Sequence, residues 1–575
     1  MTHSQAQSVH RLYAFLLCSL IACSQSAGAR SILVLAPHSD DEALMASGVI
    51  YRAKSNGDSV HVVVMTNGDS QGKSVGLARQ SETVSAMSVL GLNEQEIIFL
   101  GYGGGTLNTL YKLRDGGTVV TSKAGEKRTY GTRGLGHSDF HRFLHGKAGE
   151  YTRNTIVADL KSLLKKYNPD DIYTTSFYDD HPDHRATYGL LIEALLDLIR
   201  SGSPLRPRIH ETFIHAPGSC PGGANCGSGG WPRPVFTPGE PFPQPNLHST
   251  PYRWNEVQNI PVPAAMQDTD PAHNLKYQTI AVYVSQAPPP GHSNWLQAFV
   301  KKNEFFWIHD FGANLAPLAQ VAASSEQSAS GQSAPAAVDG VIAGDPLDAD
   351  REWVPKDYSA GAWLSLSWTA PVTISRVRLY DRPSPIDNIL SGILLFSDGS
   401  SVAVPALPQN GAGLMLDFDP KTVTWLKLRI ERAQGKNPGL AEIEVFGVSR
   451  PNPSILPQIV DGPEPDKENL ISGDRATLTI QAFDVEGKPL RYTWSCDLGS
   501  ISGDGPVAVF RAPSVATDSI ATITVAVQGE HGTVHNSAFV QVRKPRSRLK
   551  RLASALVSPL KWLWHFLRRR ILKAL

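Results

Sequence analysis

Short runs of Val, Ile and Leu alternate with segments of helical spacing through the first half of the chain. These runs have the length and composition of parallel strands that are buried on both faces. We expect strands at 31–36, 60–65, 97–100 and 172–175, and helices at 42–56, 77–90, 156–167 and 184–200. Strands that alternate with helices imply crossover connections, so the pattern predicts an α/β domain with a mostly parallel sheet over residues 30–317.

The pattern changes after residue 317. Residues 318–337 are rich in Ala, Ser and Gln without a hydrophobic period, which is typical of a flexible linker. Residues 338–449 contain short alternating strands separated by turns, which predicts a β-sandwich. A Pro-rich stretch at 450–465 indicates a second linker, and residues 466–544 have the pattern of a second, smaller sandwich. The chain is therefore expected to hold three folded domains.

The composition is that of a globular protein. Of the 575 residues, 41% are hydrophobic and 19% are charged, which excludes a mainly disordered chain and a coiled coil. The longest apolar stretch, residues 12–22, is too short to span a bilayer. A polytopic membrane protein is therefore also excluded.

The net charge of +1 hides an uneven distribution. From Arg543 onward the chain has eleven Lys and Arg and no acidic residue, which leaves the rest with a net charge of −10. In the tail, residues 545–575, apolar side chains including Trp564 fall on one helical stripe beside basic residues. A basic amphipathic tail of this kind favours an anionic membrane surface as partner, rather than nucleic acid. Docking of the tail on its own domain is the alternative.

Residues 1–29 have the features of a secretory signal. Arg11 precedes the apolar run 12–22, and small residues follow it. Cleavage after Ala29 competes with a lipobox at 20–23, in which Cys23 becomes a lipidated first residue, and a buried N-terminal helix is the third interpretation. The signal predicts an extracytoplasmic protein, located in the periplasm, on the cell surface or secreted.

Export makes disulfides available, and two cysteines are placed for one. Cys220 and Cys226 bracket a flexible loop that a disulfide would close. We favour this over a metal site, because no second cysteine pair completes a thiolate ligand set. Cys496 remains, and it is expected to be buried as a small apolar residue.

A polar motif, Pro-His-Ser-Asp-Asp-Glu at 37–42, follows the first predicted strand. Ligands of parallel sheets gather at the carboxyl ends of strands, and His38 and Asp41 can converge on one point there. Ser39 and Glu42 also fit a capping box at the start of a helix. Capping does not explain two consecutive carboxylates beside a histidine, because they repel each other unless a cation intervenes.

A second motif, Asp-Asp-His-Pro-Asp-His at 179–184, follows the strand 172–175 and leads into a helix. Together the two motifs can supply two histidines and one carboxylate to a metal, namely His38, Asp41 and His184. Three protein ligands leave a position open for water, as in catalytic zinc sites. The same ligand set also suits Fe²⁺.

Three further residues can complete a hydrolytic site. Asp40 lies next to a predicted ligand and can act as the general base for water. His181 can donate a hydrogen bond or a proton to a tetrahedral intermediate. Asp183 can orient His181. The alternative for the second motif is a solvated polar turn.

The two motifs resemble those of the LmbE/PIG-L deacetylases, which are metal-dependent amidases acting on N-acetylglucosaminyl substrates. The resemblance extends over about residues 31–310 and includes Arg-Gln-Ser-Glu at 79–82 and Phe-Leu-Gly at 99–101. It implies a Rossmann-like fold with zinc on the three ligands, Asp40 as base and His181 as electrostatic or acid partner. It also suggests that Arg79 contacts substrate, although a surface ion pair with Glu82 explains this arginine equally well.

The chain departs from the family pattern in three places. Ser39 stands where many members have Pro, and Gly103–Gly105 stand where members often carry an acidic residue that binds sugar hydroxyls. Some relatives have a Tyr where this chain has Asp179, with Tyr178 one position away. These departures concern the sugar contacts and the oxyanion partner more than the metal.

The downstream sandwiches resemble other known domains. The first, through Trp363 and residues 437–446, is similar to galactose-binding-like (discoidin, F5/8 type C) modules, which implies either a glycan ligand or a spacer. The second is similar to immunoglobulin-like or PKD-type domains, which are mostly spacers.

The expected protein is an exported zinc-dependent N-deacetylase acting on an amino-sugar glycan or glycolipid. A non-catalytic glycan adhesin and a non-haem iron oxygenase are the alternatives.

Overall fold

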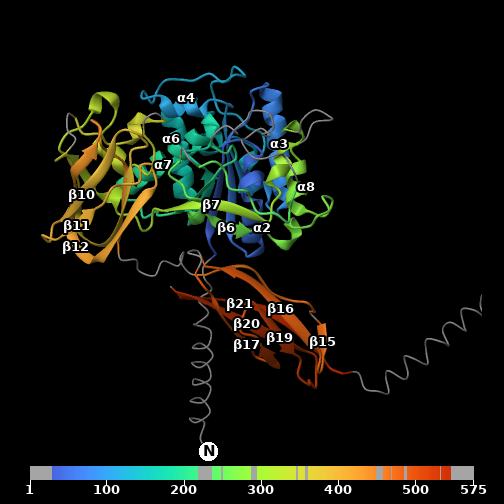
Figure 1. Cartoon of the computed structure of the whole chain (residues 1–575). Helices are drawn as coiled ribbons and strands as arrows, with labels where there is room; N and C mark the ends of the chain where they lie inside the picture. The colour runs from blue at the N-terminus through green and yellow to red at the C-terminus, as the bar shows by residue number, and fades with distance from the viewer. Residues whose placement is uncertain are drawn as a thin grey trace, which may run out of the picture. The chain divides into compact units, whose positions relative to one another are not determined.

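The computed structural model describes residues 29–217, 236–247, 250–286, 294–344, 347–356, 360–447, 457–467, 469–484, 488–530 and 532–545. The chain divides into two compact units, Met1–Ser449 and Arg450–Leu575 (Figure 1). None of the helices in the described ranges is both long enough and apolar enough to cross a membrane. The predicted signal segment, the Cys220–Cys226 disulfide and nearly all of the basic tail lie outside the described residues.

The first unit is built on a seven-stranded sheet of order β3-β2-β1-β4-β5-β7-β6. Its strands are β1 (Ser31–Ala36), β2 (Ser59–Thr66), β3 (Ile97–Tyr102), β4 (Asp171–Thr175), β5 (Arg208–Thr212), β6 (Gln258–Pro261) and β7 (Asn303–Asp310). The pairs from β3 across to β5 are parallel, while β7 runs antiparallel to both β5 and β6. The predicted α/β class with a mostly parallel sheet is therefore confirmed.

Helices cover both faces of this sheet. The main ones are α2 (Asp41–Ser55), α3 (Lys73–Val89), α6 (Arg153–Tyr167), α7 (Pro182–Arg200) and α8 (Leu275–Ala281), with the short α4 (Leu107–Lys112) and α5 (Phe140–His145) between α3 and α6. In Figure 1, α2, α3 and α8 lie on one side of the sheet and α6 and α7 on the other. The strands after β1 are added on one side of it, as β2 and β3, and the later strands from β4 on are added on its other side, so the strand order reverses between the parallel neighbours β1 and β4.

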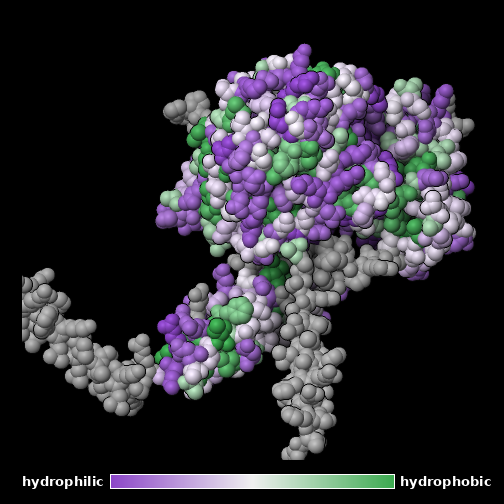
Figure 2. Space-filling model, turned by 180° about the vertical axis from the view of Figure 1, so that it is seen from behind, coloured by the Kyte–Doolittle hydropathy of each residue, from purple (hydrophilic) through white to green (hydrophobic). Residues whose placement is uncertain are grey.

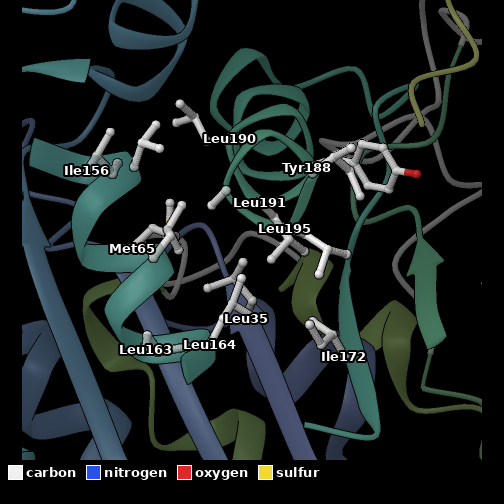
Figure 3. Packing of buried hydrophobic residues seen from close by; sticks show 14 of the residues in the cluster. Leu35, Met65, Ile156, Leu163, Leu164, Ile172, Tyr188, Leu190, Leu191 and Leu195 are labelled. Carbon is white, nitrogen blue, oxygen red and sulfur yellow. The ribbon is translucent and has the colours of Figure 1, made fainter. Parts of the chain in front are cut away.

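One continuous apolar core joins α6 and α7 to the sheet (Figure 3). Leu35 and Ile172 point up from the strands, and Leu163, Leu191 and Leu195 meet them from the helices. All five are fully buried. At about 1.5–3 kcal/mol for each buried aliphatic side chain, this layer fixes the positions of β1 and β4, and with them the two motifs that follow these strands.

The remainder of the first unit is all-β. A six-stranded sheet has the order β11-β10-β12-β9-β13, with β8 paired to β9. Its strands are β8 (Gln320–Ala323), β9 (Trp363–Asp381), β10 (Asn388–Phe396), β11 (Ser401–Val404), β12 (Gly413–Gln434) and β13 (Leu440–Gly447).

The flexible linker expected at residues 318–337 is not what the structure shows. Part of this stretch forms β8, and Ala334 and Ala337 are buried in the core of the all-β region. Alanine and serine pack closely because they are small, and such packing leaves no hydrophobic period in the sequence. The segment is therefore a folded part of the first unit.

Polar and apolar contacts join the α/β region to the all-β region within this unit. Arg351 donates from Nε to the Tyr111 hydroxyl of α4 (2.6 Å) and forms an ion pair with Asp339 (2.9 Å). Phe311 and Val341 belong to the same core as α7. At Gly340 (φ +72°) a Cβ would lie 2.9 Å from the Phe311 ring, so glycine is required at this approach.

The second unit consists of two four-stranded sheets, of order β14-β16-β19-β18 and β15-β21-β20-β17. The first contains β14 (Gln458–Pro465), β16 (Arg475–Phe483), β18 (Ser500–Ser502) and β19 (Val507–Arg511). The second contains β15 (Asn469–Ile471), β17 (Arg491–Cys496), β20 (Ser519–Gly529) and β21 (Gly532–Arg543). Cys496 is a free cysteine and is half-buried against the core, rather than fully buried as expected.

The surface of the first unit is mostly hydrophilic on the face shown in Figure 2. Hydrophobic residues occur there in small scattered groups. Scattered exposed apolar side chains are normal for a globular surface. This view therefore gives no reason to seek a large apolar interface on that face.

Candidate metal and active site

The two polar motifs meet between β1 and β4, where the strand order of the sheet reverses. Pro37 follows β1, residues 176–181 follow β4, and these strands are parallel neighbours with Leu35 opposite Thr174. Each motif leads directly into a helix, α2 from Asp41 and α7 from Pro182. This position, at the carboxyl ends of the strands where their order reverses, is the usual ligand position in an open α/β sheet.

Three predicted ligands form a small triangle, which we call the strand-end triangle: His38, Asp41 and His184. His38 Nδ1 lies 3.1 Å from His184 Nε2, and Asp41 Oδ2 lies 3.2 Å from each of these nitrogens. Ligands at about 2.0–2.1 Å around a tetrahedral zinc ion are separated by about 3.3 Å. The spacing and the donor set of the triangle therefore fit a divalent metal ion.

His184 is held by a carboxylate on its other side. Asp179 Oδ1 lies 3.2 Å from His184 Nδ1, and both side chains are fully buried. Asp179 Oδ2 in turn accepts hydrogen bonds from the backbone N–H groups of Ile214 (2.8 Å) and His215 (3.0 Å). A carboxylate behind a ligating histidine fixes the orientation of the ring and raises its basicity.

The carboxylate of Asp183 contacts His38 rather than the His181 ring. Its Oδ2 lies 3.5 Å from His38 Nε2 and accepts the N–H of Gly105 at 2.7 Å, while Oδ1 accepts the N–H of Asn108 at 3.2 Å. The glycine loop at 103–105 thus supplies backbone donors where an acidic side chain was expected from the family pattern. Asp183 is therefore placed to orient His38, a predicted metal ligand, and not His181 as expected.

His181 is the N-cap residue of α7 and is adjacent to the triangle. Its ring nitrogen belongs with those of His38 and His184 to a group whose ligand atoms lie within 4.8 Å of one another. The backbone N–H of Asp183 donates to His181 Nδ1 (3.2 Å), which places the proton of the neutral ring on Nε2. His181 can therefore donate a hydrogen bond from Nε2.

Asp40 has a strained backbone beside the triangle. Its φ of 117° is unusual for a residue other than glycine, and such conformations cost about 1–3 kcal/mol and concentrate at functional sites. Its side chain makes no capping hydrogen bond to α2, although its N–H donates to Glu42 Oε2 (3.1 Å). Ser39 Oγ is buried without a hydrogen-bond partner among the described residues. Capping by Ser39 therefore does not account for the motif.

The surroundings of the site shift the pKa values of Asp40, His38 and His181 in different directions. Burial raises the pKa of Asp40 well above its usual range, and Asp41 adds to this, whereas Arg79 opposes it. Burial would lower the pKa of His38, but the adjacent Asp183 and Asp41 raise it to about 9. Burial together with the neighbouring His38 and His184 lowers the pKa of His181 to about 3. His181 is therefore neutral near pH 7.

Arg79 contacts Gly68 rather than Glu82. Its Nη1 donates to the Gly68 carbonyl at 2.8 Å, and a Cβ on Gly68 would lie 1.9 Å from the same nitrogen. Glu82 instead accepts from the N–H and the hydroxyl of Ser285 (2.8 and 2.5 Å). The surface ion pair between Arg79 and Glu82 is thus not formed, and the substrate-contact interpretation remains a prediction.

A further histidine beside the site, His215, was not predicted from the sequence. The ring centroid of His215 lies 5.0 Å from that of His184 and 5.3 Å from that of His181. It follows β5, so the same strand-end signal that marked the two motifs could have found it. The strand itself was not recognised, because β5 reads Arg-Ile-His-Glu-Thr and lacks an apolar run.

Two segments of the chain match known protein families. Residues 33–195 match the family described as GlcNAc-PI de-N-acetylase, PIG-L. Residues 314–446 match a domain of unknown function, DUF7402. The first match contains both motifs, so the part of the chain that builds the strand-end triangle is similar to the PIG-L family. No curated protein matches the chain at a significant level.

Several solved structures are similar to parts of the chain. N,N'-diacetylchitobiose deacetylase from Pyrococcus horikoshii is 17% identical with a TM-score of 0.29, and the match covers 54% of this chain and 94% of that one. Chitosan-binding module 1 of a chitosanase/glucanase from Paenibacillus sp. IK-5 is 21% identical with a TM-score of 0.20, covering 23% and 98%. The family 32 carbohydrate-binding module of C. perfringens NanJ, in complex with galactose, is 22% identical with a TM-score of 0.20, covering 23% and 97%.

Proposed function

We propose that this protein is an exported, zinc-dependent N-deacetylase that hydrolyses the acetamide of an N-acetylglucosamine-type glycan or glycolipid. The observation that carries this proposal is the strand-end triangle with Asp40 beside it, inside the segment that matches the PIG-L family. A buried carboxylate outside the ligand set is what hydrolysis by an activated water requires. A purely binding domain has no use for it.

The residues around the triangle divide the work of hydrolysis. Zinc held by His38, Asp41 and His184 would lower the pKa of a water to about 7 and polarise the acetamide carbonyl. Asp40 takes the proton of the attacking water, whose oxygen bonds to the carbonyl carbon. His181 donates from Nε2 to the carbonyl oxygen as negative charge develops there. The C–N bond then breaks, the amine leaves with the proton from Asp40, and acetate remains.

The other parts of the chain support a location and a class of substrate. The signal features of residues 1–29 favour export, and the basic tail favours an anionic membrane surface. The all-β region of the first unit is proposed to bind glycan and to keep the catalytic site close to polymeric or membrane-linked sugar. Arg79 is proposed as a contact to that sugar.

Acetate release from a panel of N-acetylglucosaminyl compounds by the full chain tests this proposal. We expect release that stops with a chelator, returns with zinc and is lost in Asp40→Asn. Asp180→Asn is the matched control, because Asp180 is an exposed carboxylate in the second motif. A chain that binds metal but releases no acetate from any compound would contradict the proposal and favour the adhesin. Oxygen consumption with Fe²⁺ would instead favour the oxygenase.

A further inference from the structure

A second group of histidine and aspartate side chains lies away from the strand ends. His141 and His145 are one turn apart on α5, and their ring centroids are 4.5 Å apart. Asp159 on α6 accepts from His141, with Oδ1 2.8 Å from Nδ1. The ligand atoms of these three residues, which we call the helix cluster, all lie within 4.8 Å of one another.

Two members of the helix cluster are held in place. Asp159 is 1% exposed, and its Oδ2 accepts from the buried Tyr102 hydroxyl at 2.9 Å, which leaves Oδ1 directed at His141. The His141 ring packs against Gly149, where a Cβ would lie 2.8 Å from the ring. His145 is exposed, so its ring is free to turn toward the other two at little packing cost.

The donor set of the helix cluster selects a class of ligand. Two imidazoles and one carboxylate suit zinc and its neighbours in the transition series, whereas calcium and magnesium prefer oxygen ligands. Histidines four residues apart on a helix present their rings on one face. A His–Asp ion pair alone would explain His141, but it would not place a second imidazole beside it.

We propose that His141, His145 and Asp159 form a second divalent-metal site, which takes zinc or a similar transition cation. Bound metal would fasten α5 to α6. The segment between β3 and α6 that contains α5 also contains Gly105 and Asn108, whose N–H groups hold Asp183. The second metal would therefore have a structural role in supporting this segment. The proposal does not depend on the deacetylase activity.

Metal counting on the full chain without an added histidine tag tests the second site. The starting protein is His38→Ala/His184→Ala, which lacks two of the three ligands of the strand-end triangle. Zinc and Co²⁺ are titrated into metal-free protein, with calorimetry for stoichiometry and visible absorption for the Co²⁺ ligand field. We expect one ion per chain in this variant, and binding weakened by more than about tenfold when His145→Ala is added.

His137→Ala is the matched control. His137 is an exposed histidine shortly before α5, and it pairs with Glu94 instead of Asp159. We expect it to leave the binding unchanged. His145 is exposed, so its removal should not unfold the chain, and circular dichroism checks this. The proposal is overturned if the double variant binds no zinc, or if His145→Ala binds zinc as tightly as its parent.

Discussion

The strand-end triangle and the helix cluster have the same composition, two histidines and one aspartate, but different surroundings. In the triangle the donor atoms of all three residues lie 3.1–3.2 Å apart, whereas in the helix cluster the close pair is His141 Nδ1 and Asp159 Oδ1 at 2.8 Å. The triangle lies at the carboxyl ends of two central strands, and the helix cluster joins a short surface helix to its neighbour. The donor set alone therefore does not distinguish a catalytic site from a structural one.

The two sites differ in the residues that contact their donor side chains from behind. In the triangle, Asp179 holds His184 and Asp183 contacts His38, and both carboxylates are fixed by backbone N–H groups. Asp40 and His181, the proposed base and hydrogen-bond donor, lie beside the triangle. Behind the helix cluster, Tyr102 holds Asp159. Catalysis requires groups that bind no metal, and only the triangle is proposed to have them.

The largest effect is expected from His184→Ala. This change removes one corner of the triangle, so we expect acetate release to fall below detection. Zinc content should fall by one ion per chain, while the helix cluster keeps its own. Metal analysis beside the activity assay checks both expectations. Loss of both ions would show that the two sites are not independent.

Asp40→Asn should separate metal binding from catalysis within the triangle. Because Asp40 is not a ligand, we expect the zinc content to remain unchanged. The kcat should fall about 10²- to 10⁴-fold, which is the usual contribution of a general base. Steady-state kinetics with metal analysis of the same sample give the answer, and Asp180→Asn serves as control. An unchanged kcat would assign the base to another residue.

Asp179→Asn tests the carboxylate behind the ligand. Loss of its charge should weaken metal binding at the triangle by about 10- to 100-fold, as is usual for partners of ligating histidines. Excess zinc should then restore most of the activity, and the helix cluster should not respond. Competition with a chelator of known affinity measures the change. A fall in kcat that excess zinc does not correct would place Asp179 in the reaction itself.

The smallest effect is expected from Tyr102→Phe. The change removes the hydroxyl that holds Asp159, so we expect metal binding at the helix cluster to weaken only a few-fold. The free energy of unfolding should fall by about 1 kcal/mol, because a buried carboxylate oxygen loses its donor. Denaturant unfolding and Co²⁺ titration check these values. A change in kcat would show that the two sites communicate.

The meeting of the two motifs could be predicted because it depends on local signals. Apolar runs mark β1 and β4, and parallel strands bring their carboxyl ends to one edge of the sheet. His38, Asp41 and His184 follow those strand ends, so their convergence needed no tertiary detail. The contacts of Asp183 could not be predicted in this way, because its partners Gly105 and Asn108 lie just before and within α4, far from it in the sequence.

The errors have physical causes as well. Strand β5 is buried although it is polar. Its residues Arg208 and His210 can lie inside the sheet because they pair with Asp171 of the neighbouring β4. A hydrophobic pattern cannot mark such a strand, and His215 at its end was missed with it. The segment 318–337 was read as a linker because its small side chains pack without any visible period.

The contacts between the α/β and all-β regions bear on how this protein could have been assembled in evolution. A gene shortened at residue 317 would encode a catalytic part without Arg351, the partner of Tyr111, and without the Gly340 carbonyl that Tyr188 bonds. Tyr111 lies on α4, whose neighbouring residues hold Asp183. Recombination at that boundary would remove these contacts, so we expect residues 30–447 to be inherited as one piece.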